Sequence, residues 1–178
     1  GFGVSTGESN ISTNTLAQID VQSGAGLLNR TGDLDLGTRT DAGIFPAANL
    51  FAAGAVTGGS ARANGTTNAV NRITTNNASF GGEDITFNAG RDVQKAGNRM
   101  TTEANTDITT ISLGGITLPQ ANAVINETNT IDILGTSKIE ALQDVNLITT
   151  EGLGGNQRAK TDGQVLNISL VPFTIDLP

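Results

Sequence analysis

The feature that most strongly limits the possible folds of this chain is a short sequence phrase that occurs twice. Residues 78–93, ASFGGEDITFNAGRDV, are echoed by residues 137–145, SKIEALQDV. The shared positions are Phe87, Ala89, Asp92 and Val93 in the first copy and Ile139, Ala141, Asp144 and Val145 in the second. Each copy is typical of a strand, a tight turn and the start of another strand. The repetition predicts a coil of short strands. The inward layer predicted for the first copy consists of Phe80, Ile85, Phe87 and Val93.

Alternating polarity extends this interpretation to other parts of the chain. Ile19 and Val21 flank Asp20, and residues 34–36 repeat the pattern, which indicates strands with one buried face. Within residues 128–149, pairs of apolar residues begin six to eight residues apart. Three such strands with their bends predict a coil of about twenty residues, in the range of small solenoid repeats.

These patterns predict an all-β fold, a parallel β-solenoid (right-handed β-helix) with loop or hairpin insertions. In such a fold the strands of one coil pair with those of the next, so that even short strands are supported. The alternative is a β-sandwich subunit whose last strands add to the sheet edge of a neighbouring molecule.

Composition along the chain predicts its domain organisation. Residues 1–10 are rich in Gly and Ser, which favours a linker or arm. Residues 11–178 are predicted to form a single β-solenoid domain with an insertion at about 41–72. Inside that insertion, Pro46 precedes an Ala-rich stretch typical of a short helix. The Gly-Gly pair at 114–115 predicts either a hairpin or two short coil faces.

The inventory of side chains favours thin layers and excludes several classes of function. Only 37 % of the residues are hydrophobic, and the chain has 23 Gly and six Phe but no Trp or Tyr. It has no Cys, which excludes disulfides and thiolate metal sites. A net charge of −7, with ten scattered Lys and Arg, argues against nucleic acid as a partner. No apolar run is long enough to predict a transmembrane span.

The candidate site residues are acidic. Asp92 and Asp144 fit bends in which a carboxylate accepts backbone N–H groups. Glu83, Asp84 and Asp92 are candidate ligands for calcium, which prefers oxygen. Because their spacing lacks the further Gly of the calcium-binding nonapeptide GGxGxDxUx, structural turns are favoured and no cofactor is predicted.

Catalysis is not predicted either. The carboxylate pairs suited to acid–base chemistry are Asp33 with Asp35 and Glu83 with Asp84. The chain lacks His, Tyr, Trp and Cys, and these pairs are typical of ordinary charges in turns or at strand edges. The prediction is therefore a protein without catalytic residues.

The segments DITFNAGRDV and KIEALQDVNLITTEG resemble the repeats of filamentous-haemagglutinin-type adhesins and related large bacterial exoproteins. The resemblance covers about residues 78–93 and 131–152. It implies a secreted right-handed parallel β-helix that serves as a fibre or an adhesive surface, with no catalytic residues to carry over. The chain departs from the family phrase at Leu142, which replaces Gly, and residues 46–56 have no counterpart in it.

The function expected from these observations is a non-enzymatic structural or adhesive module at a bacterial cell surface. It would be a segment or stacking subunit of a surface fibre or adhesin. The expected partners are further copies, end to end or edge to edge, and a surface glycan or cell receptor. The alternatives are a polysaccharide-processing or polysaccharide-binding β-helix protein, a filament subunit that assembles by strand addition, and an ice-binding solenoid with outward Thr.

Overall fold

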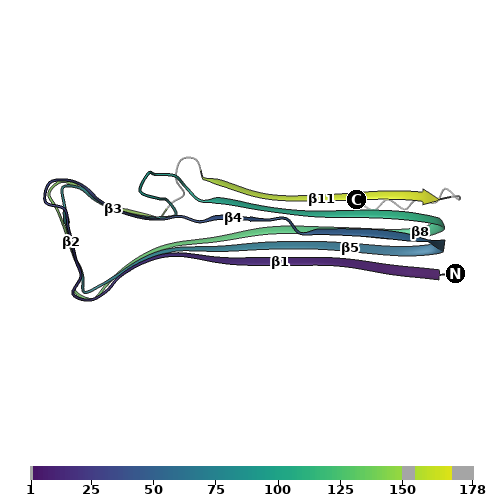
Figure 1. The fold of residues 1–178 in the computed structure, drawn as a ribbon, viewed down its shortest axis with the longest axis horizontal. Helices are drawn as coiled ribbons and strands as arrows, with labels where there is room; N and C mark the ends of the chain where they lie inside the picture. Colours follow the sequence, from purple (N-terminus) through teal and green to yellow (C-terminus); the bar gives the residue numbers. More distant parts are fainter. Residues whose placement is uncertain (1, 150–154, 170–178) are drawn as a thin grey trace.

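The computed structural model describes residues 2–149 and 155–169, which form strands and no helix (Figure 1). In chain order the strands are β1 (Phe2–Val21), β2 (Gly26–Leu28), β3 (Leu34–Thr38), β4 (Asp41–Ile44), β5 (Ala47–Asn76), β6 (Ser79–Gly82), β7 (Ile85–Ala89), β8 (Arg99–Leu134), β9 (Lys138–Ala141), β10 (Val145–Ile148) and β11 (Asn156–Ser169). No helix long and apolar enough to cross a membrane occurs in this described part.

Every pairing between these strands is parallel and joins successive coils of one winding chain. Ile19 lies opposite Ile73, and Ile73 lies opposite Ile131, so the first coil advances by 54 residues and the second by 58. The prediction of an all-β parallel β-solenoid is confirmed. The β-sandwich alternative is wrong, because it needs antiparallel sheets. The predicted coil of about twenty residues is also wrong, because the coil contains strands far longer than those inferred.

The long strands build a flat two-layered arm (Figure 1). Its outgoing layer consists of β4, residues 47–54 of β5, residues 99–112 of β8, and β11. Its return layer consists of β1, residues 56–76 of β5 and residues 114–134 of β8. Strands β5 and β8 turn back at the far end of the molecule and therefore belong to both layers (Figure 1).

Small side chains allow the two layers of the arm to lie close together. Their shared core contains Ala48, Ala61, Ala63, Ala104 and Ile108. The hydroxyl oxygens of Thr67 and Thr102, from opposite layers, lie 2.8 Å apart. A Cβ added at Gly65 would lie only 2.7 Å from Thr102 Cγ2, so this position has no room for a larger residue. The thin core expected from the composition is therefore present.

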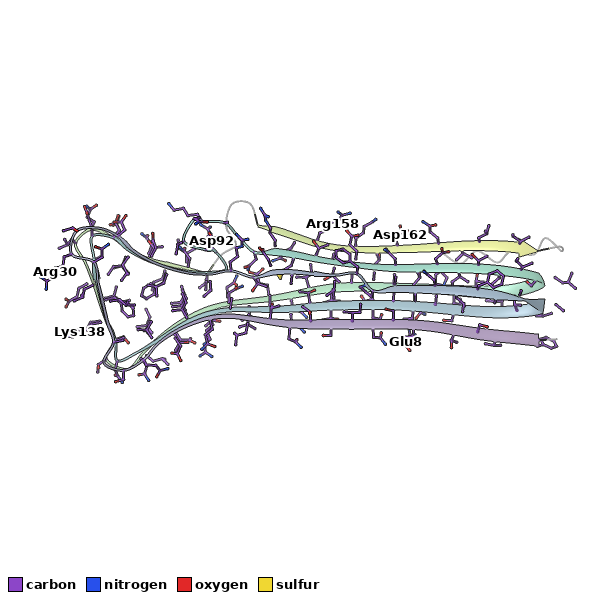
Figure 2. The ribbon with its side chains drawn as sticks, in the orientation of Figure 1. Glu8, Arg30, Asp92, Lys138, Arg158 and Asp162 are labelled. Carbon is purple, nitrogen blue, oxygen red and sulfur yellow. The ribbon has the colours of Figure 1, made fainter. Side chains whose placement is uncertain are left out.

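The other end of the molecule is a three-sided head (Figure 2). Two sides are the sheets β2-β6-β9 and β3-β7-β10, and the third is the end of the return layer. Larger side chains fill it: the rings of Phe80 and Phe87 pack edge to face with centroids 5.1 Å apart, and Ile85 is fully buried beside them. The inward layer predicted for the repeated phrase is confirmed for these three residues. It is wrong for Val93, which is 50 % exposed.

Three predicted boundaries do not match the observed strands. Residues 2–10, predicted as a linker or arm, lie in β1 and pair with β5. Residues 41–72, predicted as an insertion with a short helix after Pro46, belong to β4 and β5 in the outgoing and return layers. The Gly pair at 114–115 does not close a hairpin, because β8 pairs in parallel with β5 on both sides of it; the alternative of two coil faces is confirmed, since residues 99–112 lie in the outgoing layer and residues 114–134 in the return layer. Small and polar side chains in alternation are enough to fill the narrow core between the two layers. These stretches therefore lack the large apolar residues of an ordinary strand.

The two copies of the repeated phrase are displaced from each other in the coil. Phe80 lies opposite Ile139, and Ile85 lies opposite Val145, so the counterpart of Asp144 is Asp84 and not Asp92. Phe87 pairs instead with Leu36 and Leu147. The displacement arises because the two copies lie on different sheets, Phe87 in β7 and Ile139 in β9. The corner between these two sheets also differs in length from coil to coil. In the third coil it includes Leu142, which is 80 % exposed. A bend that points into solvent accepts extra residues without disturbing the strand register on either side.

Candidate functional site

The outer face of the β3-β7-β10 sheet forms the floor of a groove in the head. Asp35, Thr86 and Asn146 lie opposite one another across the three strands. Two residues further along the strands, Gly37, Asn88 and Ile148 form the next row. Strand alternation directs these side chains outward while Ile85 and Phe87 point into the core.

Stacked aspartates occupy the corner at one end of this floor. The backbone N–H of Asp84 donates to Asp33 Oδ1 at 3.3 Å, and that of Asp144 donates to Asp84 Oδ1 at 2.9 Å. Backbone bonds reinforce the ladder, since Leu34 N donates to Asp84 O at 2.8 Å and Ile85 N donates to Asp144 O at 2.9 Å. The carboxylates of Asp33 and Asp84 therefore each hold the residue just before a strand of the next coil.

A loop of residues 90–98 between β7 and β8 forms the wall at the other end. Within it, Asp92 Oδ1 accepts hydrogen bonds from the backbone N–H groups of Gln94 and Ala96, both at 2.9 Å. Asp92 Oδ2 accepts a bond at 2.9 Å from Arg39, which belongs to the previous coil. The Asp92 carboxylate thus closes the loop and ties it to the body. Figure 2 labels Asp92 in this loop.

The partners of Arg39 also affect its own ionisation. Its guanidinium donates to Asp41 as well as to Asp92. The hydrogen bond to Asp41 and the charges of both carboxylates raise the pKa of Arg39 above its ordinary value. The cation that holds the loop therefore stays charged at any physiological pH.

Gly37 allows the loop to lie directly on the sheet. A Cβ at this position would lie 2.7 Å from the backbone oxygen of Arg91 and 2.8 Å from the backbone nitrogen of Val93. Gly90 starts the loop with a φ of 100°, a conformation that favours glycine, and its N–H donates to Thr38 O at 2.9 Å. The wall is therefore positioned by backbone contacts.

Together these elements enclose a cavity of about 370 Å³, which we call the loop groove. Its corner end has the carboxylates of Asp33, Asp35 and Asp84, and its loop end has Arg91 and Lys95. Thr86, Asn88 and Asn146 line the floor, with Val93 and Ile148 as the apolar contributions. The size is at the lower end of the range for small-molecule sites, and the lining is mainly polar.

The structure places the predicted calcium ligands apart from one another. Asp84 precedes β7 and Asp92 follows it, and five strand residues separate them by roughly 16 Å at about 3.3 Å per residue. Glu83 Oε1 instead accepts a bond at 2.5 Å from Gln143 Nε2. Among the described residues there is no group of three or more His, Cys, Asp or Glu side chains able to hold a metal ion, so the calcium interpretation of Glu83, Asp84 and Asp92 gains no structural support.

The acidic pairs considered for catalysis are partly brought together. Asp33, Asp35 and Asp84 share the loop groove, whereas Glu83 is turned toward Gln143. Sequence reasoning missed the remaining polar lining, namely Thr86, Asn88, Arg91, Lys95 and Asn146. Alternation in the DITFN segment already predicts that Thr86 and Asn88 point outward. It does not predict which loop covers them or which strands lie beside them.

A second polar cluster lies between the layers where the arm meets the head. Buried Asn71 accepts a bond from Thr40 Oγ1 at 3.0 Å and donates to Asn129 Oδ1 at 2.9 Å. Asn129 and Asn98 in turn donate to Glu127 Oε1, both at 2.5 Å. These groups satisfy one another and link three coils, which indicates a structural role.

A ladder of amides runs across the outer face of the return layer. Asn68 Nδ2 donates to Asn14 Oδ1, and Asn126 Nδ2 donates to Asn68 Oδ1, both at 2.8 Å. Side chains that repeat once per coil thus add cross-strand bonds to the backbone ladder.

Comparison of the chain with family models, with curated proteins and with solved structures gave no match.

Proposed function

We propose that the chain is a non-enzymatic structural and adhesive module, a segment or stacking subunit of a fibre or adhesin on the outer surface of a bacterial cell. The observation that carries this proposal is the row of strand edges at both ends of the described stack. Among the residues that the structure describes, β1 pairs along its length only with β5, and residues 114–134 of β8 likewise pair only with β5. Strand edges of this length accept further strands readily.

The two ends are complementary to each other in register. A further coil, from a second copy or from the same chain, would place Leu27 over Ile139 and Leu34 over Val145, as Phe80 and Ile85 lie now. Asn14 would donate to Asn126 and extend the amide ladder by the bond that Asn68 already makes. Assembly end to end therefore buries apolar side chains and repeats contacts that the molecule already contains.

The roles of the carboxylates add support. Asp84 and Asp92, the acidic residues with functional interpretations, accept backbone N–H groups at a corner and in a loop. The resemblance of residues 78–93 to adhesin repeats favours the same conclusion, as does a fold whose coils each rest on the next. A glycan or a receptor on another cell is the partner expected of the adhesive surface.

The test compares two neighbouring substitutions on the open strand β1. Thr13 faces inward and is half-buried, whereas Ser12 is exposed on the outer face. Thr13→Lys would bury a charge in every junction between copies, and Ser12→Lys would add the same charge outside it. Sedimentation velocity over a range of concentrations should show assembly for the wild type and for Ser12→Lys, and monomers for Thr13→Lys.

Circular dichroism establishes that both variants fold. A wild-type chain that stays monomeric at every concentration, or a Thr13→Lys variant that assembles normally, would refute stacking through this end. Electron microscopy of the assembled fraction should show extended particles whose coil repeat is about 4.8 Å along the fibre axis.

Polysaccharide binding is a second candidate function, and the loop groove favours it. The groove combines acceptors, donors and hydroxyl groups on a rigid floor.

A further inference from the structure

An amide oxygen in the loop groove lacks a hydrogen-bond partner. Asn88 lies on the outer face of β7, lines the groove, and is only 3 % exposed because the 90–98 loop covers it. Within the described part of the chain, its Oδ1 has no hydrogen-bond partner. Buried polar atoms are nearly always bonded in folded proteins, so this oxygen marks a place for a donor from a ligand.

The rest of the lining defines what the ligand must offer. Asp33, Asp35 and Asp84 are acceptors; one oxygen of Asp33 and one of Asp84 already accept a backbone N–H, and the other carboxylate oxygens can accept donors from the ligand, as can Asn88 Oδ1. Lys95 on the loop is a donor and needs an acceptor. A hydroxyl group does both, and a ligand with hydroxyl groups along its whole length would match every part of the groove.

The dimensions favour a short chain over a single ring. From Asp84 to Asn88 the floor extends roughly 13 Å at about 3.3 Å per residue, and its three strands give a width of roughly 10 Å. The loop covers the last row of the floor, at Gly37 and Asn88, so that about 10 Å of its length lies open. With only Val93 and Ile148 as apolar lining, the groove offers little to a hydrophobic ligand.

We propose that the loop groove binds an oligosaccharide of two or three residues. The sugar hydroxyl groups donate to the corner carboxylates and to Asn88, and the Thr86 and Asn146 side chains bond the middle of the ligand. The Asp92–Arg39 pair and the contact of the loop with Gly37 hold the wall in place before the ligand arrives, which lowers the cost of binding. This inference rests on the adhesive part of the proposed function and assigns it a site.

The binding test uses the ¹⁵N-labelled full chain titrated with three trisaccharides, namely cellotriose, chitotriose and trigalacturonate. At least one should shift the side-chain amide signals of Asn88 and Asn146. Asn146→Ala removes one floor amide that is exposed and away from the core, and should weaken binding about fivefold to tenfold through the loss of one hydrogen bond. The matched control is Asn122→Ala, an exposed strand amide on the outer face of the return layer, and should leave affinity within about twofold.

Three results would overturn the inference: no shift of groove signals with any trisaccharide, equal weakening by both substitutions, or shifts produced by the peptide tetraglycine and not by sugars. Sedimentation of the same samples reports assembly separately. If the chain assembles but binds no sugar, the proposed sugar site is refuted while the proposed stacking module is not. Binding by the monomeric Thr13→Lys variant would show that the groove works without assembly.

Discussion

The close approach of the two arm layers gives the most direct test of the fold. Gly65 on β5 faces the interior, and an added Cβ would lie 2.7 Å from Thr102 Cγ2 and 3.0 Å from Pro46 Cγ on the opposite layer. Both neighbours are held in strands or beside one, so Gly65→Ala must push the layers apart. Gly58 lies on the same strand, but its added Cβ would meet only Val4 Cγ2, at an ordinary 3.7 Å. Gly58→Ala is therefore the matched control.

The expected magnitude follows from two opposing effects. Both substitutions restrict the unfolded chain equally and stabilise the folded state by about 0.4–1 kcal/mol where the backbone is compatible. Overpacking at Gly65 costs about 1–3 kcal/mol in addition, because the surrounding atoms must shift. The free energy of unfolding of Gly65→Ala should thus be about 1–3 kcal/mol below that of Gly58→Ala.

Urea unfolding followed by circular dichroism measures this difference, provided that the slope of the transition is the same in both variants. Equal stability of the two variants, or a more stable Gly65→Ala, would refute the argument. The layers would then be farther apart than the contact of Gly65 with Thr102 requires.

Two further predictions concern the polar side chains. Asn71→Ala removes one hydrogen-bond partner from the buried Thr40 and one from the half-buried Asn129, and should lower the unfolding free energy by about 1–3 kcal/mol. Asn68→Ala on the exposed amide ladder should cost about 1 kcal/mol or less. Equal losses in urea unfolding would contradict a structural role for the buried cluster. Asp92→Ala removes the acceptor for the N–H groups of Gln94 and Ala96, so hydrogen exchange at these two amides should accelerate while exchange in β7 stays slow. Substitution of the exposed Asp107 by Ala should leave both amides unchanged, and unchanged exchange in Asp92→Ala as well would show that the carboxylate does not hold the loop.

Alternation predicted correctly where the side chains of the repeated phrase point. Phe80, Ile85 and Phe87 are buried in the head because a strand of period two, with one apolar face, has only one stable way to lie on a core. The prediction that Val93 points inward was wrong, because β7 ends at Ala89 and the chain leaves the sheet at Gly90. The positive φ of Gly90 could not be predicted from the residue pattern.

The candidate site was predictable only in part, for a related reason. Asp92 was expected to accept backbone N–H groups in a bend, and it does. The pairing of Asp92 with Arg39, 53 residues earlier, depends on how coils stack. The groove likewise needs residues from three strands of three coils, and no local pattern connects Asp35 with Thr86 and Asn146.

The sequence by itself determined the class of the fold: period-two strands, turn-forming residues between them, and side chains too small for a thick core require thin parallel layers. Only the tertiary structure decided the length of a coil and the register between coils. Backbone hydrogen bonds between parallel strands are the same at every register, so the register is selected by the whole set of inward contacts. Those contacts include the close fit at Gly65, the packing of Phe80 on Phe87 and the amide bonds of Asn71.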